Sequence, residues 1–236
     1  MAWVIGVDVG GTFTDFFAVD PATGEQALFK RPSTPDDPGR AILDGLREME
    51  AATGVVLAEA ERIAHGTTVA TNALIQRRGG KVTLVTTQGF RDLLEIGRQV
   101  RPHMYDLQLD VPSPLVPEER RLEISERISA GGRIVKPLVD EEVARIVEAV
   151  RSTEAEACAV CLLFAFESPQ HEQKVRGALA KAMPDLHLSI SSDVQPEFRE
   201  FERFATTVIN AYLQPVMTGY VDRLAKGVAE VAPMAS

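Results

Sequence analysis

The sequence has little of what marks several classes of protein. Its 236 residues include two cysteines and one tryptophan, so it lacks the disulfide framework of small secreted domains. No stretch reaches the roughly 18 uncharged apolar residues that a membrane-spanning helix needs. The formal net charge of −9 argues against nucleic acid or an anionic membrane as the main partner. The sequence therefore predicts a globular protein that binds neither.

The N-terminus MAWVIGVDVGG shows no secretory signal, because it has no basic segment and Asp8 interrupts its apolar run. We expect a soluble, cytoplasmic protein.

Cys158 and Cys161 form a Cys-x-x-Cys in the apolar run EACAVCLLFAF, which is typical of a buried strand. Residues three apart on a strand point to opposite faces, and no second Cys/His pair at zinc-ligand spacing follows. Both cysteines are therefore predicted to be core residues rather than metal ligands.

The first third of the chain predicts three strands followed by helices. Short apolar segments separated by turn residues favour an antiparallel meander over residues 3–9, 12–19 and 26–30. Asp37 and Pro38 are typical of a helix start, as N-cap and first helical residue. A second helix is predicted over residues 67–78, closed by Gly79 and Gly80, before a strand at 81–87.

The remainder alternates between helices and strands after an irregular, proline-containing stretch near residues 98–137. Alternation of this kind predicts an α/β layered domain. A long helix over residues 198–213 should end or kink at Pro215, and the tail after it should fray. Between the irregular stretch and this long helix we expect a helix at 140–152, a strand at 157–164, a helix at 168–183 and a strand at 187–191.

The strongest motif is Asp8-Val9-Gly10-Gly11-Thr12-Phe13-Thr14-Asp15, which joins the first two predicted strands. A turn without Cβ atoms lets a phosphate group approach backbone N–H groups. The predicted donors are the amides of Gly10, Gly11 and Thr12 and the hydroxyls of Thr12 and Thr14. Carboxylates at the strand ends suit Mg²⁺, bound directly or through water; Asp8 and Asp15 are the candidates. The alternative is a bare hairpin turn, which needs neither an acid before the glycines nor two threonines after them.

These residues resemble the first phosphate motif of the actin/sugar-kinase/Hsp70 superfamily, and more closely the hydantoinase A/5-oxoprolinase/acetone carboxylase family. The resemblance runs through several blocks in order: IGVDVGGTFTD at 5–15, HGTTVATNA at 65–73, GFRDLLEIGRQVRPHMYDL at 89–107, Glu126-Arg127, AVCLLFAF at 159–166 and SSDVQPEFREFERFATTVINAYL at 191–213. It implies a ribonuclease H-like (actin-like ATPase) α/β lobe, with a mixed sheet opening in an antiparallel meander, followed by a long helix. The lobe is expected over residues 1–195, and residues 196–236 would begin a second region.

The segment His65-Gly66-Thr67-Thr68-Val69-Ala70-Thr71-Asn72 is the second candidate. Gly66 and the following hydroxyls suit a helix N-terminus that faces a ligand. The alternative is an ordinary N-cap with His65 in the core, and the residues alone do not separate the two. The resemblance favours a cleft where substrate meets ATP, with His65 and Thr67 as catalytic and Thr68 and Asn72 as substrate-binding residues.

A third group follows in Gly89–Asp106, where arginine side chains suit a carboxylate or a phosphorylated intermediate. The resemblance implies a catalytic role for Arg98 and substrate binding by Arg91, Asp92 and Arg101. The alternative is a solvated basic edge with local Arg–Asp pairs. The charges of EFREFER at 197–203 are predicted to form a solvated helix face.

The resemblance implies that a complete enzyme uses ATP and Mg²⁺ to phosphorylate the carbonyl oxygen of a cyclic amide or ketone, with a hydantoinase B-type subunit as partner. Chains of this family are much longer, and we expect this one to stop before the second phosphate loop and the adenosine pocket. The apolar stripe from Phe201 to Tyr212 would then be partly uncovered. One alternative is a non-catalytic fragment or split module; a sugar kinase is weaker, because HGTTVATNA and GFRDLLEIGRQ do not look like that family.

Overall fold

The computed structural model describes residues 2–34, 37–100, 105 and 112–235. The chain divides into two compact units, and each is described by itself. The first unit is Met1–Arg77 with Val216–Ser236, and the second is Arg78–Pro215. The boundary expected at residue 195 concerns the domains of longer family members and stays a prediction.

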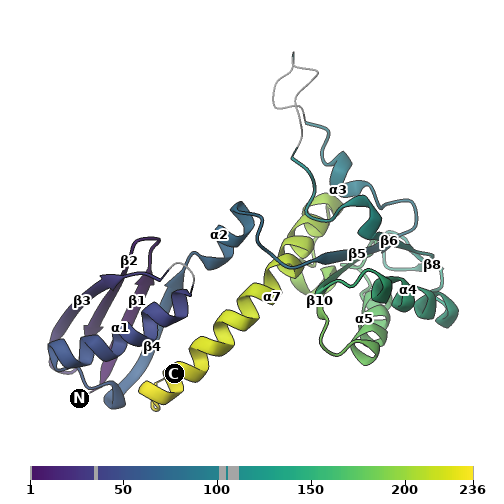
Figure 1. Ribbon diagram of the computed structural model, residues 1–236. Coiled ribbons are helices and arrows are strands. Elements are labelled where there is room, and N and C mark those ends of the chain that lie inside the picture. The colour runs from purple at the N-terminus through teal and green to yellow at the C-terminus, as the bar shows by residue number, and fades with distance from the viewer. Residues whose placement is uncertain (1, 35–36, 101–104, 106–111, 236) are drawn as a thin grey trace. The chain divides into compact units, whose positions relative to one another are not determined.

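The first unit is built on a mixed four-stranded sheet, in the order β3-β2-β1-β4. β1 and β2 are antiparallel, as are β2 and β3, whereas β1 and β4 are parallel. The antiparallel meander at the start of an α/β fold is thus confirmed (Figure 1). The elements are β1 (Trp3–Val9), β2 (Phe13–Val19), β3 (Gln26–Pro32), α1 (Pro38–Thr53), a 3₁₀ turn (Leu57–Glu59), β4 (Ala60–Thr67) and α2 (Val69–Ile75).

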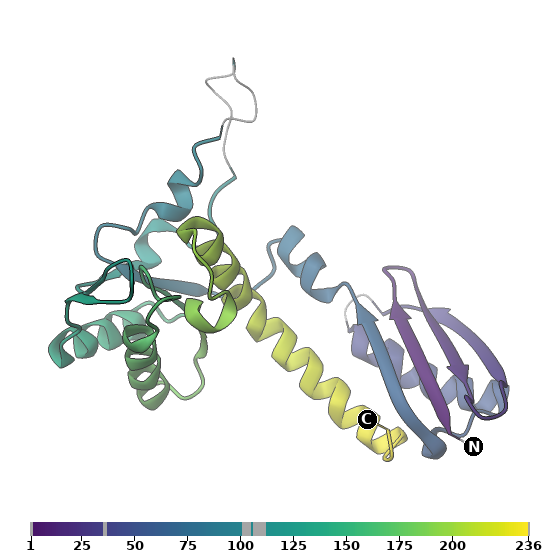
Figure 2. The same ribbon diagram turned by 180° about the vertical axis from the view of Figure 1, so that it is seen from behind.

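One face of this sheet is covered and the other is open. Alternate residues of β1 and β2, including Ile5 and Phe16, pack against α1 in one core. Figure 2 shows the strands in front of α1, seen from the open side. The helix α1 begins at Pro38, as predicted, but the Asp37 side chain makes no capping hydrogen bond. The Thr34 hydroxyl oxygen instead accepts from the amide of Ala41 at 3.1 Å.

The second unit contains a parallel sheet in the order β10-β9-β5-β6. Helices α4 and α5 pack on one face, where Cys158 joins their core. Cys161 lies beside Thr207 of α7, so the cysteines face opposite sides, and both are fully buried as predicted. The elements are β5 (Val82–Thr87), α3 (Leu93–Ile96), a 3₁₀ turn (Glu118–Arg120), β6 (Arg121–Ile124), β7 (Arg127–Ile128), β8 (Ile134–Lys136), α4 (Asp140–Ser152), β9 (Ala157–Cys161), α5 (Gln170–Ala182), β10 (His187–Ile190) and α6 (Ser191–Val194).

The long helix α7 (Glu200–Val231) contains Pro215 inside it. Of the two outcomes expected at the proline, an end of the helix was therefore wrong, as was the frayed tail. The carbonyl of Tyr212, close to the proline, accepts a hydrogen bond from the amide of Gly80 at 2.8 Å. Beyond the proline, Leu224 and Val231 pack on the core of the first unit. Tertiary packing on both sides of the proline therefore maintains the helix.

The predicted helix at 67–78 also differs from the structure. Pairing with β1 continues through Thr67, which leaves only Val69–Ile75 for α2. Gly79 and Gly80 do not cap it; a Cβ at Gly79 would lie 2.3 Å from the Tyr212 ring, and one at Gly80 would lie 2.6 Å from Pro215. These glycines allow the backbone to pass close to α7. No helix in the described part of the chain is long and apolar enough to cross a membrane.

Packing of α7 corrects two further expectations. Most of the stripe from Phe201 to Tyr212 is covered, because Phe204, Val208 and Tyr212 are buried and Phe201 and Ile209 are half-buried. Arg203 is not on a solvated face; it is fully buried, and its Nη2 donates to the carbonyl of Leu162 at 2.8 Å.

Candidate functional site

The hairpin turn between β1 and β2 presents two backbone amides to the outside. Gly10 closes the turn, since its amide donates to the carbonyl of Phe13 at 3.0 Å; a Cβ there would lie 3.0 Å from that oxygen. The amide of Gly10 is therefore used inside the turn, unlike the predicted role as a ligand donor. Gly11 and Thr12 are exposed, and their amides make no hydrogen bond with other described residues. Two of the three predicted amides can thus face an anion.

A pair of hydroxyl groups supports the turn from behind. Thr14 is fully buried, and its Oγ1 lies 3.0 Å from Oγ of Ser33, which donates to the carbonyl of Gly10 at 2.8 Å. The amide of Ser33 donates to the carbonyl of Thr12 at 2.9 Å. The geometry therefore makes Thr14 a support of the turn and gives no support to its predicted role as a ligand donor. Sequence reasoning missed Ser33, which lies just after β3 and far from the motif.

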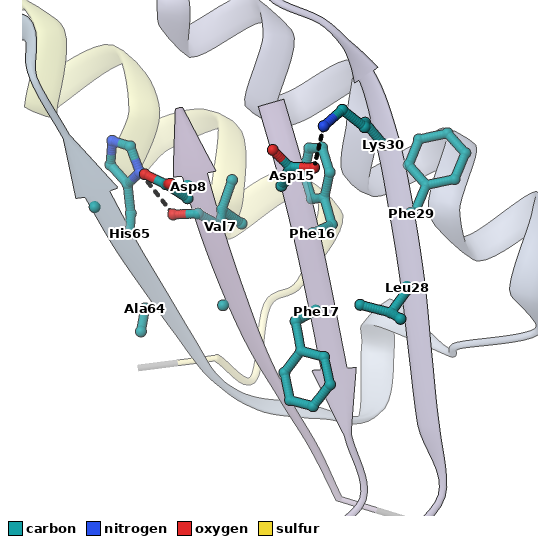
Figure 3. A pocket seen from close by; sticks show the side chains of 12 residues that line it. Val7, Asp8, Asp15, Phe16, Phe17, Leu28, Phe29, Lys30, Ala64 and His65 are labelled. Atoms are coloured by element: carbon teal, nitrogen blue, oxygen red, sulfur yellow. Dashed lines mark hydrogen bonds and ion pairs between the residues drawn. The ribbon is translucent and has the colours of Figure 1, made fainter. Parts of the chain in front are cut away.

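Three charged side chains form a row across the open face of the sheet, next to the turn (Figure 3). Asp8 of β1 is the register partner of Asp15 of β2, which is the partner of Lys30 of β3. Lys30 Nζ lies 3.0 Å from Asp15 Oδ1 and 4.9 Å from the centre of the Phe13 ring. Asp8 is exposed and has no ion pair among the described residues. Lys30 thus compensates the negative charge of Asp15, whereas the negative charge of Asp8 has no ion-pair partner among the described residues.

This row bears on the predicted magnesium site. Magnesium in nucleotide sites is held by one or two carboxylates, phosphate oxygens and water. An exposed, uncompensated Asp8 beside two unpaired amides fits that description. Asp15 fits less well, because Lys30 already occupies one of its oxygens. In the described residues no three His, Cys, Asp or Glu side chains converge as a metal cluster, so the metal would depend on phosphate and water for most ligands.

A shallow hollow of about 810 Å³ lies on the open face, and the three residues of the charged row form part of its lining. Small residues line one side of it and large apolar residues the other. The small side is made by Gly6, Ala64 and Gly66, and the large side by Phe17 and Leu28. Leu28 is 76% exposed. The open face of this sheet therefore exposes apolar surface that was not predicted.

His65 lies in β4 and bonds to Tyr220 of α7 through its Nε2. Its Nδ1 is 3.5 Å from the carbonyl oxygen of Val7. Burial lowers the pKa of His65, partly opposed by that backbone contact and by the charge of Asp8. The side chain of Thr67, the last residue of β4, lies near the hydroxyl of Tyr220. Both predicted catalytic residues thus contact a tyrosine that sequence reasoning missed.

The predicted substrate residues of α2 bond to each other. Thr68 precedes the helix, and its Oγ1 accepts from Nδ2 of Asn72 at 3.2 Å. Both side chains are exposed. Their predicted contact with a substrate stays a prediction.

The predicted arginine clamp belongs to the second unit, and acidic residues pair with its members. Arg91 lies 2.5 Å from Glu118 and 3.5 Å from Asp92. Arg98 pairs with Glu202. Arg101 lies outside the described residues. A substrate anion would have to compete with these pairs, so the local Arg–acid alternative is the arrangement present in this structure.

The structure is that of an α/β protein in which a glycine hairpin joins the two central strands of a mixed sheet. A family model for the hydantoinase/oxoprolinase N-terminal region matches residues 4–183. This chain belongs to the hydantoinase/oxoprolinase family.

Known proteins are similar to this chain over nearly its whole length. Caprolactamase subunit alpha of Pseudomonas jessenii is 38% identical over 226 residues, covering 93% of this chain and 32% of the subunit. 5-Oxoprolinase 1 of Arabidopsis thaliana is 34% identical over 247 residues, covering 91% of this chain and 19% of the oxoprolinase. The chain thus spans about a third of the caprolactamase subunit and a fifth of the oxoprolinase.

Two solved structures share the fold. The ATP-dependent caprolactamase from Pseudomonas jessenii superposes with a TM-score of 0.87 at 36% identity, over 100% of this chain and 34% of the other. Nucleotide-free acetone carboxylase gives a TM-score of 0.86 at 24% identity, over 97% of this chain and 34% of the other; at that identity only the fold is informative.

Proposed function

We propose that this chain is the phosphate-binding portion of an ATP-dependent enzyme that activates the carbonyl of a cyclic amide, or of a ketone, by phosphorylation. Membership of the hydantoinase/oxoprolinase family and similarity to an ATP-dependent caprolactamase support the substrate class. We further propose that residues 1–195 belong to an actin-like ATPase lobe; the glycine hairpin that opens the first mixed sheet supports this.

One observation carries the proposal: the unpaired amides of Gly11 and Thr12 lie beside the uncompensated carboxylate of Asp8. Amides at a turn bind phosphate oxygens, and a carboxylate next to them repels phosphate unless a cation lies between. The combination therefore suits a metal–phosphate complex better than a free anion.

In this proposal Asp8 would hold Mg²⁺ on the phosphate side of the turn. Bound there, the cation would neutralise charge on the phosphate oxygens. Gly11 and Thr12 would fix the phosphate chain, while Gly10 and Thr14 would keep the turn in shape. Asp15, which Lys30 compensates, would act at most through water.

The reaction we propose transfers the terminal phosphoryl group of ATP to the carbonyl oxygen of the substrate. A new O–P bond forms, the bond to ADP breaks, and phosphate leaves later as the ring opens or carboxylation occurs. Phosphoryl transfer of this kind depends on positioning and charge neutralisation. We propose that His65, Thr67, Thr68, Asn72, Arg91, Asp92, Arg98 and Arg101 serve the substrate side, and that a hydantoinase B-type subunit is the partner.

The fraction of its relatives' length that this chain covers favours a second possible function. Because it spans about a third of the caprolactamase subunit, the phosphate-binding turn could act only together with further polypeptide. The chain would then be a non-catalytic module that binds Mg–ATP weakly and turns none over.

Binding and turnover separate these possibilities. Isothermal titration calorimetry of residues 1–236 should show Mg²⁺-dependent ATP binding, and Thr12→Ala should weaken it. ATP turnover is then measured with hydantoin, 5-oxoproline or caprolactam present, and we expect no enzymatic rate from this chain alone. Substrate-stimulated ATPase activity would refute the need for other polypeptide. Absence of Mg–ATP binding would refute the phosphate-binding function itself.

A further inference from the structure

Tyr220 is a buried tyrosine at the meeting point of three elements of the first unit. It lies in the part of α7 that packs on this unit and is 3% exposed. Its ring lies 5.8 Å from that of His65 in β4, tilted by 54°. A Cβ built on Gly39 of α1 would lie 3.8 Å from the Tyr220 ring. The phenol is thus enclosed by α1, β4 and α7.

The donor and the acceptor of each hydrogen bond around this phenol can be assigned from the carbonyl of Val7. The carbonyl of Val7 can only accept, so Nδ1 of His65, 3.5 Å away, carries the proton. Nε2 then has a lone pair, and the hydroxyl of Tyr220 donates to it. The oxygen of Tyr220 can still accept, and the side chain of Thr67 lies near it. Thr67 Oγ1 in turn accepts from the amide of Val69 at 3.2 Å.

This arrangement occupies both ring nitrogens of His65. A neutral imidazole with a donating Nδ1 and an accepting Nε2 has no further lone pair for a proton. His65 is therefore placed to position its neighbours rather than to act as a general base.

The end of β4 needs such an anchor. Among the described strands, β4 pairs only with β1, at the edge of the sheet. Its last residues lie beside the phosphate site, because Gly66 is the register partner of Asp8; a Cβ at Gly66 would lie 3.6 Å from Oδ1 of Asp8. Movement of this strand end would therefore change the space around Asp8.

We propose that Tyr220 is a positioning residue for the phosphate site: its hydroxyl holds His65, two residues before Thr67, and so fixes the end of β4 beside Asp8. This inference rests on the proposed function for its effect on binding, but the contact itself can be tested without nucleotide.

The test compares Tyr220→Phe with Tyr212→Phe in the 236-residue chain. Phenylalanine removes the hydroxyl and keeps the ring. Tyr212 is a matched control because it is a buried tyrosine of the same helix, assigned to the other unit. Two quantities are measured at one fixed pH: the ¹⁵N shifts of the His65 ring nitrogens by NMR, and the dissociation constant of Mg–ATP by calorimetry.

We expect the parent chain to show one neutral His65 tautomer with the proton on Nδ1. Tyr220→Phe should shift the Nε2 signal and weaken Mg–ATP binding about fivefold, the effect of losing one hydrogen bond of typical strength. Tyr212→Phe should change neither quantity. His65→Leu, which removes the same hydrogen bond from the other side, should weaken binding to a similar extent.

The outcomes separate the contact from the function. A parent tautomer with the proton on Nε2, or ring signals unchanged in Tyr220→Phe, would overturn the proposal. Shifted ring signals with unchanged Mg–ATP affinity would reduce Tyr220 to a structural residue and overturn its positioning role. If the parent binds no Mg–ATP, the proposed function fails and the positioning role for it falls, while the ring signals still decide whether the contact exists.

Discussion

Ser33→Ala tests whether the hydroxyl pair behind the turn holds the phosphate site in shape. Ser33 donates its hydroxyl proton to the carbonyl of Gly10 at 2.8 Å. Thr14 must therefore be the donor in the second contact, in which its Oγ1 lies 3.0 Å from Ser33 Oγ. The substitution removes both hydrogen bonds, one at an exposed carbonyl and one at a fully buried hydroxyl.

The two losses differ in magnitude. The carbonyl of Gly10 can bond to water instead, so its loss costs about 0.5–1.5 kcal/mol. The buried hydroxyl of Thr14 is left without a partner, which costs about 1–3 kcal/mol. We expect the free energy of unfolding of the first unit to fall by about 1.5–4.5 kcal/mol, the sum of these two ranges. Thr14→Val removes the stranded hydroxyl, so adding it to Ser33→Ala should recover about 1 kcal/mol, a coupling that a double-mutant cycle measures.

The protein contains its own reporter for this measurement. Trp3 is the only tryptophan; it lies in β1 and is 3% exposed, so urea unfolding followed by its fluorescence reports the first unit. Thr23→Ala is the control, because Thr23 is an exposed residue of the same unit whose Oγ1 accepts from the amide of Glu25 at 3.3 Å. A loss in Ser33→Ala no larger than in this control would refute the reasoning. So would a double variant that loses the sum of the two single losses.

Three further predictions concern the open face and β4. Asp8→Asn should abolish the Mg²⁺ dependence of ATP affinity, seen by calorimetry with and without the metal; an unchanged dependence would contradict the proposed metal role of Asp8. Leu28→Asp should lower the binding of an apolar dye and any self-association measured by light scattering, because Leu28 is 76% exposed at the hollow. Ile75→Asp is the control: it changes a 74% exposed position of α2 and should not affect dye binding at the hollow. Burial lowers the pKa of His65 below its usual 6.5, so the folded state resists protonation. Its contribution to stability is present above pH 6.5 and lost as pH falls through the lowered pKa. The unfolding free energy should therefore fall more steeply below pH 6.5 in the parent than in His65→Gln, and parallel curves would contradict this.

The sequence was most informative where structure is local. The alternation in residues 3–9 and 12–19 and the glycines between them predicted β1, β2 and their turn, and helical spacing predicted α4. The edge strand β4 was missed because AERIAHGT has two charged residues at 61 and 62, a glycine and little β-branching. Its pairing with β1, some sixty residues earlier in the chain, specifies it, and no short window contains that information.

The same limit applies to the site. Asp8, Gly11 and Thr12 could be predicted because they lie within one motif. Ser33 and Tyr220 could not, because they reach the site through the sheet register and the packing of α7. One signal for α7 was readable: Tyr220, Leu224, Gly227 and Val231 follow a helical spacing. Pro215 outweighed that signal in the prediction, although packing compensates for the proline.

The charged row on the open face is the point where the sequence departs from what folding alone would favour. Like charges directly opposite on neighbouring strands destabilise a sheet, yet Asp8 and Asp15 are register partners. Lys30 relieves only Asp15, so Asp8 keeps its charge at the end of β1, beside amides that no described group satisfies. Departures from local folding rules are expected at functional sites. A cation with phosphate would relieve both the carboxylate and the amides at once, which neither a cation nor an anion does alone.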